Sequence, residues 1–160
     1  MRATRFNHVS VHVLDMEESL RFYMEVFGME RLPSPNFSQH VEWLRVGEQQ
    51  LHLFKSENPA PRSHHFALDV DDFEAAYRKA EELKLLDDET FGAAVRELPD
   101  GAVQMYIRDP AGNLVEVNWP DVSTLDRSVV TTIRRVADER PQSGEAASAT
   151  LYHVAGKALR

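Results

Sequence analysis

Four alternating segments of this chain each contain one residue type that commonly binds metal ions. These residues are His8, His52, His65 and Glu116. Successive side chains of a β-strand point to opposite faces, and in each segment the apolar residues fall on the other face. Because that apolar set must pack on helices, the four polar residues should share the face away from the helices. Imidazole plus carboxylate is a suitable ligand set for Zn²⁺, Fe²⁺, Ni²⁺, Co²⁺ or Mn²⁺.

Glu116 sits alone among apolar residues in the segment 114–118. A buried, unpaired carboxylate is expensive, and a metal ion would compensate it. The alternative is an exposed Glu on an edge strand. For the three histidines, the alternative is a groove lined by polar side chains without a metal.

The turn before this segment is strongly encoded. Asp109-Pro-Ala-Gly-Asn113 combines a residue with fixed φ, a glycine able to adopt positive φ, and two side chains that bond locally. With alternating residues on both sides, the stretch 103–118 predicts a β-hairpin.

The chain also contains an internal repeat. The alternating segment at His8 is followed by Asp15 after seven positions, and the one at His65 is followed by Asp72 after the same interval. Each Asp precedes a helical pattern and is a good N-cap residue, although in the second half Asp71, with Glu74, is an alternative cap. Each half therefore reads as a βαβββ unit, and a repeat of this kind fixes the architecture.

We thus predict an α+β fold: two paired βαβββ modules form a curled mixed β-sheet around a metal groove, with the helices outside. The first module covers about residues 5–55 and the second about 63–119, within one domain of residues 1–119. Residues 120–160 form an appendix. A stripe of Leu125, Val129, Ile133 and Val136 predicts a C-terminal helix that stops at Arg140-Pro141, followed by an arm or tail.

Composition narrows the function classes. The net charge of −8 argues against a general nucleic-acid binder, which needs a basic face. Cysteine is absent, so there is no disulfide framework and no thiol nucleophile. No run approaches the roughly 20 apolar residues of a membrane span, and the first residues lack a signal-like apolar core. We expect a cytoplasmic protein without nucleic-acid or membrane partners.

The doubled βαβββ unit resembles the vicinal oxygen chelate superfamily, which includes glyoxalase I, methylmalonyl-CoA epimerase, extradiol dioxygenases, and fosfomycin- and bleomycin-resistance proteins. The matching motifs are His8-Val-Ser-Val-His-Val-Leu-Asp15, Leu51-His-Leu-Phe54, His65-Phe-Ala-Leu-Asp-Val-Asp-Asp72 and Asp109-Pro-Ala-Gly-Asn-Leu-Val-Glu116. The resemblance covers roughly residues 5–119. It implies that His8, His65 and Glu116 are metal ligands. His52 falls where glyoxalase-like and epimerase-like members have a fourth ligand, usually Glu or Gln.

The resemblance implies two enzyme classes. In a glyoxalase-like lyase or isomerase, one divalent metal ion binds two adjacent oxygens of a small substrate while a carboxylate, here Glu116, moves a proton. In an extradiol dioxygenase, two His and one Glu bind Fe²⁺. That class also needs an upstream His near residues 97–99, where this chain has none, so the lyase or isomerase is favoured. A metal-free drug-binding protein is a further alternative.

Tyr106 and His12 share the expected groove face. Each could act as an acid or base beside the metal, or simply form the wall of the groove. We further expect a homodimer, because open sheets leave edge strands that need cover.

Overall fold

A computed structural model describes residues 5–152 of the chain. The chain forms two compact units. The first comprises the residues up to Phe66 together with Arg108–Val115, and the second comprises Ala67–Ile107 together with the chain from Glu116 on. Each unit is built around one mixed sheet, which confirms the predicted α+β class with two βαβββ repeats. No helix among the described residues has the length and apolarity needed to cross a bilayer.

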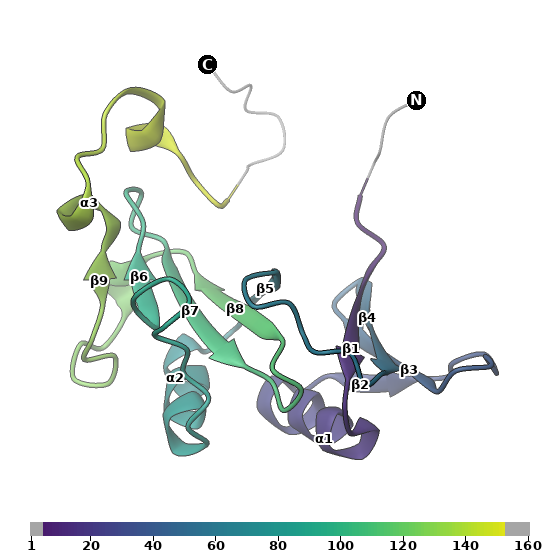
Figure 1. Ribbon diagram of the computed structural model, residues 1–160. Coiled ribbons are helices and arrows are strands. Elements are labelled where there is room, and N and C mark those ends of the chain that lie inside the picture. The colour runs from purple at the N-terminus through teal and green to yellow at the C-terminus, as the bar shows by residue number, and fades with distance from the viewer. Residues whose placement is uncertain (1–4, 153–160) are drawn as a thin grey trace, which may run out of the picture. The chain divides into compact units, whose positions relative to one another are not determined.

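The sheet of the first unit has the strand order β1-β4-β3-β2. Its elements are β1 (His8–Val13), α1 (Met16–Phe27), β2 (Glu30–Leu32), β3 (Val41–Val46) and β4 (Gln49–Lys55) (Figure 1). β1 runs parallel to β4, whereas β3 is antiparallel to both of its neighbours. The parallel pair follows from the intervening α1, since a parallel connection needs a long crossover.

α1 begins and ends where its sequence signals lie. The Asp15 carboxylate accepts a hydrogen bond from the backbone N–H of Glu18, and Gly28 ends the helix in the left-handed region at φ 61°. A residue without Cβ adopts that conformation at little cost. The buried side of α1 is largely apolar and packs on the sheet; it carries Met16, Ser19, Leu20, Phe22 and Tyr23.

The second sheet has the order β5-β8-β7-β6-β9 and falls largely in the second unit, with His65, Phe66, Leu114 and Val115 counted in the first. Its repeat elements are β5 (His65–Asp69), α2 (Phe73–Glu82), β6 (Val95–Glu97), β7 (Val103–Arg108) and β8 (Leu114–Trp119). Asp72 caps α2 by accepting from the backbone N–H of Ala75. The rings of Phe73 and Trp119 are in contact, which places the odd-numbered face of β8 toward α2. The even-numbered face, with Glu116, therefore points away from α2.

The turn between β7 and β8 forms as predicted. The Asp109 carboxylate accepts from the backbone N–H groups of Ala111 and Asn113, from the Asn113 amide, and from the hydroxyl of Tyr23 on α1. Gly112 has φ 83°. Burial raises the pKa of Asp109 even though these donors favour its charged form. The turn is thereby bound to the first unit, to which it belongs.

The continuous C-terminal helix predicted from Leu125 is wrong. The chain instead forms a 3₁₀ turn (Val122–Thr124), a short strand β9 (Arg134–Arg135), one helical turn α3 (Val136–Glu139) and a second 3₁₀ turn (Gly144–Ser148). Residues 129–133 are Val-Val-Thr-Thr-Ile, and five consecutive β-branched residues disfavour a helix. Arg134 and Arg135 instead form β9, whose backbone pairs in parallel with the strand β6. The last part of the predicted tail, from residue 153, lies outside the described residues.

Candidate metal and substrate site

Two of the predicted ligands, His8 and His52, meet on the face of the first sheet away from α1. Their rings stack with centroids 4.2 Å apart, and Trp43 stacks on the other side of His52 at 4.6 Å. The strand register produces this stack, because His52 lies opposite Trp43 on β3 and beside β1 on its other edge. His52 is only 7% exposed. Burial, and then the nearby His8, lower the pKa of His52, so its ring is held neutral.

The hydrogen bonds of the histidines fix which ring nitrogen donates. His65 Nδ1 lies 2.9 Å from the carbonyl oxygen of Ser63, which can only accept, so Nδ1 carries the proton. His8 Nδ1 is 3.0 Å from Asn7 Oδ1, with the same consequence. A metal-binding His commonly donates its other N–H in this way. These residues therefore fit a divalent cation.

His52 is held differently. Its Nε2 lies 2.8 Å from Oε1 of Gln50, a residue of the same strand face, so the lone pair is on Nδ1. Gln50 is the register partner of His8. Either His52 or Gln50 could therefore be the candidate ligand that β4 presents on this face. Because the two side chains are hydrogen-bonded, a change in one also alters the surroundings of the other.

His12 lies apart from the stacked rings. It lines a pocket of about 250 Å³ in the first unit together with His65. The other residues of this pocket come from β1, from β5 and the segment before it, and from the turn and the first residue of β8; they are Val9, Ser10, Val11, Pro61, His64, Phe66, Asn113 and Leu114. An exposed imidazole in the same pocket as a candidate ligand is well placed to exchange protons with solvent.

The other two candidates, Glu116 and Tyr106, meet in the second unit. Glu116 is 3% exposed, and its Oε1 accepts a hydrogen bond of 2.8 Å from the amide of Gln104. The Tyr106 side chain also bonds to Glu116. Burial raises the pKa of Tyr106, and the Glu116 charge and hydrogen bond raise it further, so the phenol stays protonated and donates.

Gln104 was not among the residues predicted from the sequence. The signal was present, because Gln104 and Tyr106 are two positions apart on β7 and must share a face. No three His, Asp or Glu side chains of the described residues are gathered around one point in the manner of a metal centre. His8, His52, His65 and His12 belong to the first unit, while Glu116 and Tyr106 belong to the second.

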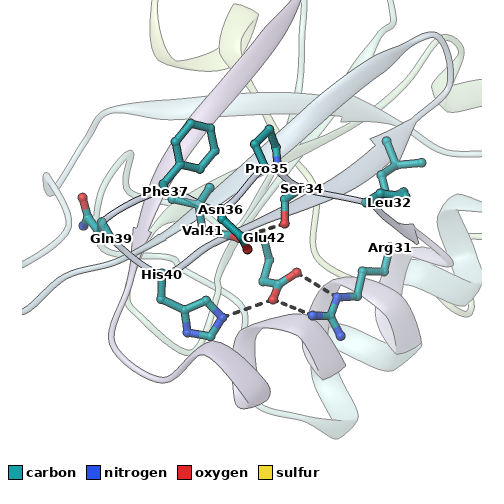
Figure 2. A pocket seen from close by; sticks show the side chains of 11 residues that line it. Arg31, Leu32, Ser34, Pro35, Asn36, Phe37, Gln39, His40, Val41 and Glu42 are labelled. Atoms are coloured by element: carbon teal, nitrogen blue, oxygen red, sulfur yellow. Dashed lines mark hydrogen bonds and ion pairs between the residues drawn. The ribbon is translucent and has the colours of Figure 1, made fainter.

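A second, larger pocket of about 630 Å³ lies beside the loop that joins β2 and β3 (Figure 2). At its base Glu42 forms a bidentate pair with Arg31, at 2.8 and 2.5 Å, and its Oε1 lies 3.1 Å from Nε2 of His40. Burial opposes the charge of Glu42, but these donors outweigh it and lower its pKa. The acid of this pocket is thus neutralised by neighbours within the unit.

Residues 5–117 match the model of the Glyoxalase/Bleomycin resistance protein/Dioxygenase superfamily. This match spans well over half of the chain, and the protein belongs to that superfamily, as the motifs predicted.

Among curated proteins, the chain is 34% identical over 126 residues to the uncharacterized protein YwbC of Bacillus subtilis (strain 168), covering 71% of this chain and 96% of the relative. It is 28% identical over 130 residues to mitochondrial methylmalonyl-CoA epimerase of Mus musculus, covering 71% of each. Among solved structures, lactoylglutathione lyase from Agrobacterium tumefaciens aligns with a TM-score of 0.57 at 25% identity, over 78% of this chain and 100% of that one.

Proposed function

We propose that this protein is a divalent-metal-dependent lyase or isomerase of the glyoxalase type, acting on a small substrate that presents two adjacent oxygens. His8, His52, His65 and Glu116 would hold one ion of Fe, Zn, Ni, Co or Mn. The similarity to a methylmalonyl-CoA epimerase and to a lactoylglutathione lyase supports this class of reaction.

The state of Glu116 carries the proposal. Glu116 is 3% exposed, and its carboxylate accepts hydrogen bonds from the neutral side chains of Gln104 and Tyr106. Neutral donors of this kind fix the orientation of a carboxylate without cancelling its charge, whereas a cation would cancel it. His8 and His65, whose Nδ1 atoms bond to Asn7 and Ser63, would supply the complementary nitrogen ligands.

The metal ion would act as a Lewis acid on the two substrate oxygens. Glu116 would take the proton from a substrate carbon that carries one of these oxygens, because carboxylates are common general bases. Tyr106 donates to Glu116 and holds the carboxylate in one orientation while it gains and returns the proton. His12 lines the same pocket as His65 and is exposed there, so it can transfer protons to solvent water.

The test combines metal binding with proton exchange. Protein stripped of metal is titrated calorimetrically with Co²⁺, Ni²⁺, Zn²⁺ and Mn²⁺, and the loaded protein is incubated in D₂O with methylmalonyl-CoA and with lactoylglutathione. We expect stoichiometric binding of one ion and deuterium incorporation next to the carbonyl by NMR. Absence of metal binding would favour the drug-binding alternative.

The dioxygenase alternative is tested separately. The Fe²⁺-loaded protein is mixed with catechols in an oxygen electrode, and we expect no oxygen consumption. Four protein ligands leave about two positions of an octahedral shell, enough for a bidentate substrate but not for that substrate and O₂ together. Rapid catechol cleavage would overturn the proposed lyase or isomerase.

We also propose a homodimer. β2 is a three-residue edge strand of the first sheet, and exposed edges favour pairing with a second chain. Light scattering at micromolar concentration should give twice the mass of 18.3 kDa. A monomer at that concentration would contradict this part of the proposal.

A further inference from the structure

The chain beyond the superfamily match folds onto the sheet of the second unit. β9 pairs with β6, so that Arg134 lies opposite Arg96. Glu139 then bonds to both arginines, at 2.7 Å from Arg96 and 2.9 Å from Arg134. This fixes the start of a segment, residues 136–152, that we call the C-terminal strap.

The far end of the strap is anchored at the opposite edge of the same sheet. The hydroxyl of Tyr152 donates to Asp69 Oδ1 on β5 at 3.0 Å. In the strand order β5-β8-β7-β6-β9, a segment fixed to β6 and to β5 must pass β7 and β8. In Figure 1 the yellow-green strap arches on the side of this sheet away from α2.

That side carries Glu116. Arg96 is the register partner of Gln104, which bonds to Glu116, so the anchor of the strap and the candidate ligand share a face. The Tyr152 hydroxyl lies close enough to Glu116 for the charge of that carboxylate to act on it. The pKa of Tyr152 is raised first by burial and then by its bond to Asp69 and the charges of Asp69, Asp100 and Glu116.

One buried group on this face lacks a partner. Asn118 is 7% exposed, and its Oδ1 is one of the few buried side-chain atoms of the described residues without a hydrogen bond. Asn118 follows Glu116 by two positions on β8, so both side chains are on the face that the strap passes. An unsatisfied buried acceptor costs about 1–3 kcal/mol, and a ligand that donates a hydrogen bond would remove this cost.

We infer that the C-terminal strap and Asn118 determine specificity, by recognising a neutral hydrogen-bond donor on the substrate beyond its pair of adjacent oxygens. Asn118 Oδ1 accepts the N–H or O–H of that group, and Tyr152 positions the strap over it through Asp69. The negative charges of Asp69, Asp100 and Glu116 disfavour a carboxylate at this place. The inference rests on the proposed metal-dependent function, and an amide N–H is the donor used to test it.

The test uses three probes on Co²⁺-loaded protein by calorimetry. Acetohydroxamate has two adjacent oxygens only; N-acetylglycine hydroxamate adds an amide N–H; the matched ester, O-acetylglycolohydroxamate, replaces that N–H by oxygen. We expect the amide to bind about three- to tenfold more tightly than the ester, the worth of one neutral hydrogen bond. Asn118→Leu should abolish this preference.

Tyr152→Phe should weaken the amide and the ester about three- to tenfold each while leaving acetohydroxamate unchanged. Tyr77→Phe is the matched control, because Tyr77 bonds to Glu81 on α2, on the other side of the sheet. Equal affinity for amide and ester in the wild type, or a preference that survives Asn118→Leu, would overturn the inference. Failure of acetohydroxamate to bind would instead refute the proposed metal function.

The strap is also tested without metal or ligand. Hydrogen exchange of the apo protein should show the amides of residues 144–152 exchanging faster in Tyr152→Phe than in the wild type, with β9 unchanged. Equal exchange in the two proteins would show that Tyr152 does not anchor the strap, and would overturn the inference whatever the probes do.

Discussion

Glu42 in the first unit and Glu116 in the second are buried to almost the same extent, 5% and 3% exposed, yet they are held by different chemistry. Glu42 faces a guanidinium in a bidentate pair, which cancels its charge (Figure 2). Glu116 accepts from an amide and a phenol, which do not. Two acids buried to the same extent can thus be held by different partners, and burial alone does not distinguish an ion pair from a candidate ligand.

The sharpest way to break this comparison is to neutralise each acid in turn. Glu116→Gln should lower the affinity for Co²⁺ by more than the roughly 10- to 100-fold lost when outer partners of a metal site are removed. The reason is that a ligand and its charge are both lost. Glu42→Gln is the matched control and should leave Co²⁺ affinity unchanged, as measured by calorimetry. Equal losses in the two variants would mean that neither acid is a ligand.

The second prediction concerns His52, which extends the comparison to the imidazoles. His52→Ala should weaken Co²⁺ binding by about 10- to 100-fold, and His52→Gln should recover most of it, because a Gln oxygen can also bind a metal. Gln50→Ala serves as control, since Gln50 touches His52 on the same strand. Unchanged affinity in His52→Ala would mean that His52 is not a ligand. A larger loss in Gln50→Ala would assign the β4 ligand to Gln50, and no loss in either variant would mean that β4 supplies no ligand.

The smallest effect is on stability and depends on pH. The pKa of Glu42 is lowered in the folded protein, so its stabilising contribution is present above its ordinary value of 4.5 and is lost as pH falls through the folded pKa. Glu42→Gln should cost about 1–2 kcal/mol at pH 7, because Arg31 is half-exposed and the pair is partly screened. The gap between wild type and variant in urea unfolding should shrink as the pH falls below 4.5. A difference in unfolding free energy that does not change with pH would contradict the stabilising role of the Glu42–Arg31 ion pair.

The sequence predicted those features whose causes are local. Asp15 and Asp72 cap their helices, and the Asp109–Asn113 turn forms, because each depends on side chains within a few residues. Face parity correctly placed Glu116 on the face of β8 away from α2. The contacts of Glu116 with Gln104 and Tyr106 also follow from alternation on adjacent strands.

The region after β8 could not be predicted in the same way. The apolar stripe from Leu125 has helical spacing, but it does not reveal that Arg134 and Arg135 find partners on β6, some 38 residues earlier. The attachment of Tyr152 to Asp69 spans 83 positions and has no periodic signal. Both depend on an already formed sheet, and so on tertiary structure rather than on neighbouring residues.

The hydrogen bond between Tyr23 and Asp109 has a consequence for how the protein is made. The two residues are 86 positions apart, and Tyr23 is fully buried. At a synthesis rate of about 5–20 residues per second, the ribosome needs roughly 4 to 17 seconds after adding Tyr23 before Asp109 joins the nascent chain. During that interval α1 lacks the acceptor for its buried phenol. The first unit is therefore completed late in translation, although nearly all of its residues are made early.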